Sequence, residues 1–152
     1  MNASAVETLM LEDVWKRVPL LRRVLRDVVD CHTARRQAKE FLDELTVISK
    51  KFTSSEITET MNRLRREVVE ADQAMDAYQK EIRNLGGFLK DPIKGLAYFY
   101  SERDGRKIFL NWELGEPDLV TWHELDESFS DRMPVDELSE DTEASLLDSQ
   151  GE

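Results

Sequence analysis

The chain has 152 residues, of which 40% are hydrophobic and 35% are charged. This length suits one domain, or an elongated element joined to one small core, and it excludes two ordinary domains. The composition favours a folded protein with a heavily solvated surface over a disordered chain. No run approaches the roughly 18 consecutive apolar residues that a membrane-spanning helix needs, so we expect no membrane partner.

The formal net charge of −11 is concentrated at the C-terminal end of the chain. The segment 134–152 has seven acidic residues and no basic one, so −11 minus −7 leaves −4 on residues 1–133. Affinity for nucleic acid comes largely from clustered Lys and Arg, and we therefore predict no nucleic-acid partner. One basic cluster keeps a small basic patch open as an alternative: Lys16, Arg17, Arg22, Arg23 and Arg26.

Two features bear on the cellular compartment. The segment Met1–Leu11 has no basic start followed by an apolar run, and so it does not resemble an export signal. Cys31 is the only cysteine, which makes an intrachain disulfide impossible. We expect a cytoplasmic protein, because a reducing compartment is the simplest one for such a chain.

A long helix is predicted over about 54–85. An apolar or small residue recurs there at alternating steps of four and three: Ile57, Met61, Leu64, Val68, Ala71, Met75, Tyr78, Ile82 and Leu85. This 3.5-residue repeat keeps one seam facing a partner helix over a length of about 48 Å. Thr53 and Glu56 have the spacing of an N-terminal capping box, and Gly86-Gly87 favours a helix end.

The preceding segment has a matching seam, which predicts an antiparallel helical hairpin over 11–85. The seam residues are Leu21, Val24, Val28, Cys31, Arg35, Ala38, Leu42 and Leu45. The connection at about 50–53 is short, and Pro19 is expected to separate a short leading helix at about 12–18. Two helices cannot also bury Val29, Phe41 and Ile48. The C-terminal module, a second copy or another protein must therefore cover them.

The period changes after Gly87 to that of a small antiparallel sheet. The runs 96–100 and 107–112 flank Asp104-Gly105 and predict a β-hairpin, and a third run at 119–122 extends it to a three-stranded meander. We therefore predict an α+β protein: an N-terminal extension over 1–10, the coiled-coil-like hairpin over 11–85, a β-rich aromatic module over 86–133 and an acidic disordered tail over 134–152.

Several motifs of this module resemble domain-of-unknown-function family 2203, a family of small uncharacterised prokaryotic proteins. The matching residues are Lys90-Asp91-Pro92, Gly95-Leu96, Phe99, Asp104-Gly105-Arg106, Leu110, Trp112, Leu114-Gly115-Glu116, Trp122-His123, Phe129 and Arg132. With a looser match at Leu11-Glu12-Asp13 and Val18-Pro19-Leu20-Leu21, the resemblance covers about 9–134.

The chain also departs from the family pattern at four positions. Tyr98 stands where the pattern has Asp, Asn111 where Cys is common, and Ser128 and Asp131 where glycines are usual. If these positions form a family site, the resemblance implies that the site is altered in this chain. It implies no reaction and no cofactor.

Six residues of the module are candidates for a ligand site: Lys90, Asp91, Glu116, Trp122, His123 and Arg132. His123 can act as an acid, a base or a ligand near neutral pH, and Arg132 can hold a carboxylate or phosphate. Structural roles are the favoured alternative, because Asp91 can shape a turn before Pro92 and Arg132 can pair with Glu116 or Asp126.

Metal binding has little support in the sequence. Cys31, His32 and His123 are too few for a structural zinc site, and a carboxylate site of His123, Glu116 and Glu124 is a weaker alternative. We predict no metal, no cofactor and no catalytic residue. The leading hypothesis is a non-catalytic interaction or scaffold protein that self-associates, or binds another protein, through its hairpin. The alternative is a small-molecule or metal-dependent function centred on Lys90, Glu116, His123 and Arg132.

Overall fold

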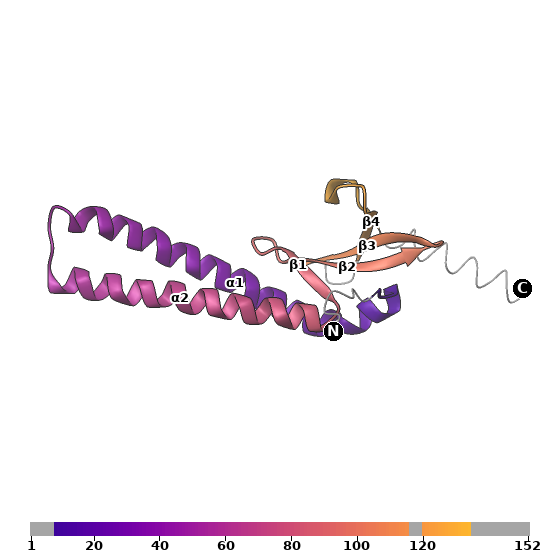
Figure 1. The fold of residues 1–152 in the computed structure, drawn as a ribbon, viewed down its shortest axis with the longest axis horizontal. Helices are drawn as coiled ribbons and strands as arrows, with labels where there is room; N and C mark the ends of the chain where they lie inside the picture. Colours follow the sequence, from indigo (N-terminus) through magenta and orange to yellow (C-terminus); the bar gives the residue numbers. More distant parts are fainter. Residues whose placement is uncertain (1–7, 116–119, 135–152) are drawn as a thin grey trace, which may run out of the picture.

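The computed structural model describes residues 8–115 and 120–134, and it has the predicted α+β architecture. Two long antiparallel helices form a hairpin, and a single antiparallel sheet follows them in the chain. Figure 1 shows that the sheet lies against one end of the hairpin while the other end projects away from it. In the described segments no helix combines the length and apolar character needed to cross a membrane.

The second helix, α2 (Ser55–Asn84), is unbroken, as the seven-residue pattern predicts. Ser54 is its N-cap, and its Oγ accepts a hydrogen bond from the Ile57 N–H at 3.2 Å. The predicted capping box of Thr53 with Glu56 is wrong, because the Thr53 hydroxyl donates back to the Ser49 carbonyl at 2.8 Å. At the other end, Gly86 has a φ of 96°, the left-handed cap that ends the helix.

The first helix, α1 (Leu11–Ser49), is continuous through Pro19, so the predicted separate leading helix is wrong. Proline removes one backbone donor and usually bends a helix without requiring it to end. Figure 1 shows this bend, with the first turns of α1 at an angle to the rest. Val14, Val18 and Leu21, on both sides of Pro19, are buried in the core. Their burial keeps this segment helical although Pro19 cannot donate a backbone hydrogen bond.

The seam between the helices forms as predicted, and its polar members have partners. Arg35, the charged seam residue, donates from Nε to Asp72 Oδ1 of α2 at 2.6 Å. Cys31 is half-buried, and its Sγ donates to the Ala71 carbonyl at 3.3 Å. Burial raises the pKa of the Cys31 thiol, and the nearby Asp72 carboxylate raises it further. The thiol therefore stays protonated and is a poor nucleophile.

The sheet has five strands in the order β1-β2-β3-β4-β5, and the predicted three-stranded meander is too small. The strands are β1 (Gly87–Asp91), β2 (Leu96–Arg103), β3 (Arg106–Glu113), β4 (Thr121–Glu124) and β5 (Met133–Pro134). The sequence does not predict β1, because the Gly86-Gly87 pair at its start indicates only the end of a helix. The last strand is two residues long and contains an edge proline, which leaves no strand pattern to read. The Asp-Gly turn between β2 and β3 is confirmed, with φ of 52° at Asp104 and 77° at Gly105.

One face of the sheet packs on the hairpin and forms the main core. Phe99, Leu110 and Trp112 are fully buried there, beneath α1 residues such as Leu25. Val29 is covered as well: a Cβ added to Gly95, between β1 and β2, would lie 3.0 Å from Val29 Cγ2. Of the possible covers named above, the β module therefore accounts for Val29. It does not cover Phe41 and Ile48, which are 44% and 47% exposed.

The ends of the two helices are fastened to this core. The Leu9 N–H donates to the Tyr100 carbonyl at 2.9 Å, so the last residues of the predicted N-terminal extension join β2. Arg17 donates to the Leu85 carbonyl at 2.8 Å and closes the C-terminal end of α2. Arg22 stacks 5.8 Å from the centre of the Trp112 ring. The basic cluster of α1 is thus partly used within the fold. The predicted acidic tail lies outside the described residues from 135 onward.

Candidate functional site

The face of the sheet that points away from the hairpin carries aromatic side chains where water-facing polar residues are usual. Cross-strand register puts Tyr98 opposite Asn111, and Phe109 opposite His123, on this face. We call it the aromatic face and define it by six rings: Phe88, Tyr98, Tyr100, Phe109, His123 and Phe129. Phe129 comes from the short 3-10 helix η1 (Phe129–Asp131), which Figure 1 shows on the side of the sheet opposite the hairpin.

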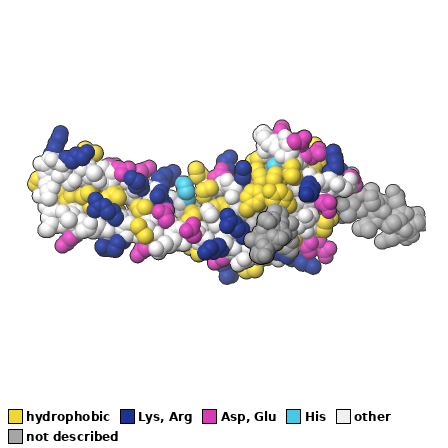
Figure 2. All heavy atoms as spheres, viewed as in Figure 1, with side chains coloured by type: hydrophobic (Ala, Val, Ile, Leu, Met, Phe, Trp, Pro, Cys, Tyr) yellow, Lys and Arg dark blue, Asp and Glu magenta, His cyan; other side chains and the backbone are white. Residues whose placement is uncertain are grey.

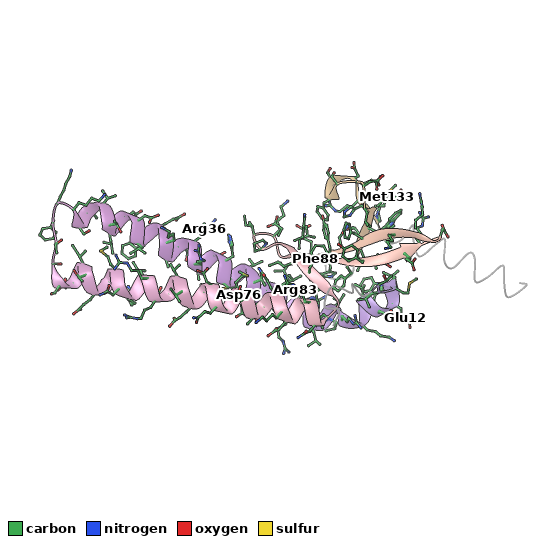
Figure 3. The ribbon with its side chains drawn as sticks, in the orientation of Figure 1. Glu12, Arg36, Asp76, Arg83, Phe88 and Met133 are labelled. Atoms are coloured by element: carbon green, nitrogen blue, oxygen red, sulfur yellow. The ribbon has the colours of Figure 1, made fainter. Side chains whose placement is uncertain are left out.

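The rings of the aromatic face are in mutual contact. Centroid distances are 4.9 Å between Tyr100 and Phe109 and 5.0 Å between Tyr98 and Phe109. His123 lies 5.1 Å from Tyr98 and 5.2 Å from Phe109. Phe88 extends the group on β1, and Figure 3 labels it across the sheet from Met133 on β5. The sheet is therefore apolar on both faces, although only one face meets the helices.

The His123 ring also belongs to a buried polar trio with Asn111 and Thr121 on this face. The exposed fractions of Asn111, Thr121 and His123 are 1%, 6% and 2%. Asn111 Nδ2 lies 3.2 Å from Thr121 Oγ1 and 3.0 Å from His123 Nδ1. An amide nitrogen can only donate, so Nδ1 of the histidine accepts and its proton lies on Nε2. The neutral ring follows from this geometry.

The charge environment agrees with a neutral His123. Burial lowers the pKa of His123 and is the largest effect; Glu127 and Asp131 act in the opposite direction, and Lys90 reinforces the lowering. Such a ring, with Nδ1 engaged, is poorly suited to act as a base near neutral pH. It can still donate from Nε2, which has no hydrogen-bond partner among the residues that the structure describes.

Two cations lie over the aromatic face. Lys90 Nζ is 5.7 Å from the centre of the Tyr98 ring, and Arg132 Cζ is 4.1 Å from that of Phe129. Burial raises the pKa of the Tyr98 hydroxyl, and Arg132 partly offsets this by favouring the ionised form. Three of the predicted site residues, Lys90, His123 and Arg132, are thus brought together around Tyr98.

The other predicted site residues do not join them. Asp91 shapes a turn, because its Oδ1 accepts from the Ile93 N–H at 2.8 Å and the Lys94 N–H at 3.3 Å. Trp122 lies on the opposite face of the sheet, where the Arg103 guanidinium stacks 4.7 Å from its ring centre. Glu116 lies outside the described residues.

The weaker metal hypothesis loses one of its ligands. Glu124 follows His123 directly, so the two side chains point to opposite faces of β4. Glu124 pairs instead with Arg106 at 3.0 Å. In the described part of the chain, no group of three His, Cys, Asp or Glu side chains is arranged to hold a metal ion.

Sequence reasoning missed the residues that organise this face. Asn111 Oδ1 is a buried acceptor without a hydrogen-bond partner among the described residues, and such an atom costs free energy. The four departures from the family pattern meet here: Tyr98 and Asn111 are cross-strand partners beside His123, and Ser128 and Asp131 hydrogen-bond at 3.2 Å to close η1. Side chains alternate between the two faces of a β-hairpin, so counting outward from the Asp104-Gly105 turn would have placed four of them on one face: Tyr98, Tyr100, Phe109 and Asn111.

The hairpin offers a second candidate surface. We call residues 33–72 the distal hairpin, since they lie beyond Val29, which the sheet covers. The described residues expose ten large hydrophobic side chains, and five of them are on the distal hairpin: Phe41, Val47, Ile48, Phe52 and Val69. Figure 2 shows hydrophobic side chains at the surface of this part as well as over the sheet.

A shallow hollow lies on the α2 side of the distal hairpin, but none of the exposed apolar side chains lines it. Its volume is about 460 Å³, and it is lined by polar and charged side chains of α2: Glu59, Thr60, Asn62, Arg63 and Arg66. It contains neither the aromatic rings nor the exposed apolar residues. We give it no functional weight, because the two surfaces above have the more specific chemistry.

The fold and these surfaces define a class: a small α+β protein in which a two-helix arm projects from a sheet that is apolar on both faces. The family model described as uncharacterized conserved protein (DUF2203) matches residues 9–135, and the chain belongs to this family. The resemblance found in the sequence is confirmed. No curated protein and no solved structure matches the chain.

Proposed function

We propose that this protein is a non-catalytic interaction module that binds another protein chain through its distal hairpin. The observation that carries the proposal is the exposure of large apolar side chains there, four of which lie within residues 41–52 at the turn end of the arm. Phe41, Val47, Ile48, Phe52 and Val69 are 44–64% exposed. Large apolar side chains that gather at one surface of a soluble protein usually mark a contact with a partner.

The distal hairpin has no role in closing the core, and this supports the proposal. The main core contains residues of α1 up to Val28, Ile82 of α2 and residues of the sheet, but none of 33–72. A bare two-helix hairpin in water is stabilised mainly by one narrow seam. An arm that adds nothing to the core and exposes Phe52 at its turn is well suited to reach a partner.

Site-specific photo-crosslinking tests this function. A photoreactive phenylalanine analogue replaces Phe41 or Phe52 on the arm, and a matched control carries it at Ile93, which is 64% exposed on the β module. The arm positions should give covalent adducts with protein in the host cell, whether with a second copy or with another chain. The proposal is wrong if the arm positions give no more adduct than Ile93.

A small-molecule function at the aromatic face is the second candidate. The specific observation in its favour is the pair of cations over the aromatic face, Lys90 over the Tyr98 ring and Arg132 over the Phe129 ring. Aromatic rings with two cations suit a planar ligand with an anionic group. Benzoate is a suitable probe, and benzyl alcohol is its uncharged control.

Nuclear magnetic resonance titration distinguishes this candidate from an architectural role. Benzoate should shift the signals of Tyr98 and His123 more strongly than benzyl alcohol does, and His123→Ala should remove the shift while leaving the fold intact. Absence of any shift at millimolar benzoate, or a loss of stability as the sole effect of the substitution, assigns the aromatic face to the architecture of the sheet.

A further inference from the structure

We infer that residues 125–132, which join β4 to β5, form a strap that covers His123 and opens when this histidine is protonated. The strap contains η1, which lies on the side of the sheet opposite the hairpin (Figure 1). It therefore covers the aromatic face from the outside. Its opening goes beyond the function proposed for the distal hairpin and is independent of it.

One apolar side chain anchors the strap to the sheet. Phe129 is half-buried, and the other seven residues of the strap are exposed, including Leu125 at 41%. The centre of the Phe129 ring lies 6.1 Å from that of Tyr98 and 6.3 Å from that of His123. The Arg132 guanidinium lies 4.1 Å from the centre of the Phe129 ring and, as part of the strap, moves with it. A segment with so little buried apolar area opens at a low cost in free energy.

The side-chain hydrogen bonds of the strap are local. Ser128 Oγ donates to Asp131 Oδ2 at 3.2 Å, and Glu127 Oε1 accepts from the N–H of Glu124, at the adjacent end of β4, at 3.0 Å. Among the residues that the structure describes, no strap side chain hydrogen-bonds to β1, β2 or β3. The strap can therefore lift from the sheet while it keeps its internal bonds.

Beneath the strap, His123 is held in its neutral form. It is 2% exposed, and its Nδ1 accepts a hydrogen bond from Asn111 Nδ2 at 3.0 Å. The rings of Tyr98 and Phe109 contact it from β2 and β3, and the ring of Phe129 contacts it from the strap. Of these three rings, only that of Phe129 can move away without disturbing a long strand. The strap thus controls the access of water to His123.

Burial and three charged side chains set the proton affinity of His123. Burial is the largest effect and lowers the pKa of His123 from its ordinary value of 6.5, and Lys90 on β1 acts in the same direction. Glu127 and Asp131, both on the strap, act in the opposite direction. Burial also raises the pKa of the Tyr98 hydroxyl, which is therefore uncharged near neutral pH. With the strap closed, His123 binds a proton less readily than a histidine in water.

Protonation and strap opening are therefore linked. An open strap exposes the ring to water, so the pKa of His123 returns toward 6.5 and the open form binds a proton more tightly than the closed form. Below pH 6.5 the ratio of open to closed strap should rise by up to about tenfold per pH unit. The rise ends at the lower pKa of the closed form, because both forms are then protonated.

Opening the strap leaves the main core in place. Phe99, Leu110 and Trp112 are fully buried on the other face of the sheet, against the hairpin. Segments with few buried contacts open at a free energy well below that of global unfolding. Mild acid should therefore expose Tyr98 and Phe109 while the sheet and the hairpin stay folded.

Hydroxyl-radical footprinting of the full-length protein, read by mass spectrometry, tests the strap. Between about pH 8 and about pH 5.5 the oxidation of Tyr98, which is 4% exposed, should rise severalfold and at most about tenfold, because about one pH unit of this interval lies below 6.5. Oxidation of Trp112 should stay low throughout, because only global unfolding exposes it. Unchanged oxidation of Tyr98, or a parallel rise at Trp112, overturns the inference.

Three variants assign the response to His123 and to the strap. His123→Gln should remove the pH dependence, whereas the matched control His32→Gln, at the other histidine of the chain, should keep it. Phe129→Ala removes the anchor and should expose Tyr98 already at about pH 8. An equal acid response in His123→Gln, or a Tyr98 that stays protected in Phe129→Ala, refutes the strap. If His123→Gln exposes Trp112 at about pH 8 and so fails to fold, the wild-type and Phe129→Ala results decide by themselves.

Discussion

Acidification should destabilise this protein because it protonates His123. The substitution His123→Gln should remove this pH effect, and Asn111→Asp should reverse its direction. Asn111 Nδ2 donates to His123 Nδ1 at 3.0 Å, and the histidine is only 2% exposed. Protonation would make Nδ1 a donor that faces a donor and would put a charge in a desolvated position. Burial therefore lowers the pKa of His123 from its ordinary value of 6.5.

The sign of the pH effect follows from the protons that each state binds. The unfolded chain protonates this histidine near pH 6.5, whereas the folded protein does so only at a lower pH. The stabilising contribution is thus complete above 6.5 and is lost as the pH falls toward the pKa of the folded state. One differential proton changes the free energy of unfolding by at most about 1.4 kcal/mol per pH unit.

Urea unfolding between about pH 5 and pH 8 measures this contribution. Carboxylates titrate over part of this range, so the informative quantity is the difference between the wild-type protein and His123→Gln. The wild-type protein should lose more stability on acidification than the variant. Parallel profiles would refute the reasoning, because they would show that His123 has the same pKa in the folded and unfolded states.

Asn111→Asp provides the reversal. A carboxylate at this position accepts a hydrogen bond from Nδ1 and raises the pKa of His123. The variant should be less stable than the wild-type protein at about pH 8, by roughly 1–3 kcal/mol, because a buried acceptor then faces the unprotonated Nδ1. Its deficit should shrink as the pH falls toward 6 and the ring becomes protonated. A deficit that grows on acidification would contradict the assigned direction of the hydrogen bond.

Two further pairs of substitutions test the local structure by denaturant unfolding. Gly95→Ala should destabilise the fold by roughly 2–4 kcal/mol, because Gly95 has a φ of 73° and an added Cβ would lie 2.9 Å from another side chain. Gly105→Ala has a similar φ but meets nothing within 4 Å, so it should cost only about 1 kcal/mol, and equal losses would refute the packing argument. Ser54→Ala should cost about 1 kcal/mol as the loss of an N-cap. Thr53→Ala should cost clearly less, and a larger loss there would restore the capping box.

The candidate site shows which functional residues can be predicted from residue type alone, before the fold is known. His123, Lys90 and Arg132 were identified because their side chains have distinctive chemistry, and the structure brings them together. Trp122 is adjacent to His123 in the chain, yet adjacent residues of a strand point to opposite faces, and it does not join the site. Asn111 hydrogen-bonds to His123, which is on another strand. The sequence therefore marks Asn111 only as a departure from the family pattern, because its neighbours in the chain do not identify this partner.

The sequence by itself determined the parts of this protein that local periodicity and turn chemistry control. The seven-residue seam from Ile57 to Leu85, the Asp104-Gly105 turn and the glycine that ends α2 are specified by neighbours in the chain, and all three are present. Only the tertiary structure decided that α1 continues through Pro19, that two more strands join the sheet, and that the aromatic face points away from the hairpin. Each of these outcomes depends on contacts between residues far apart in the chain. Their burial energy exceeds the local preferences that a sequence pattern records.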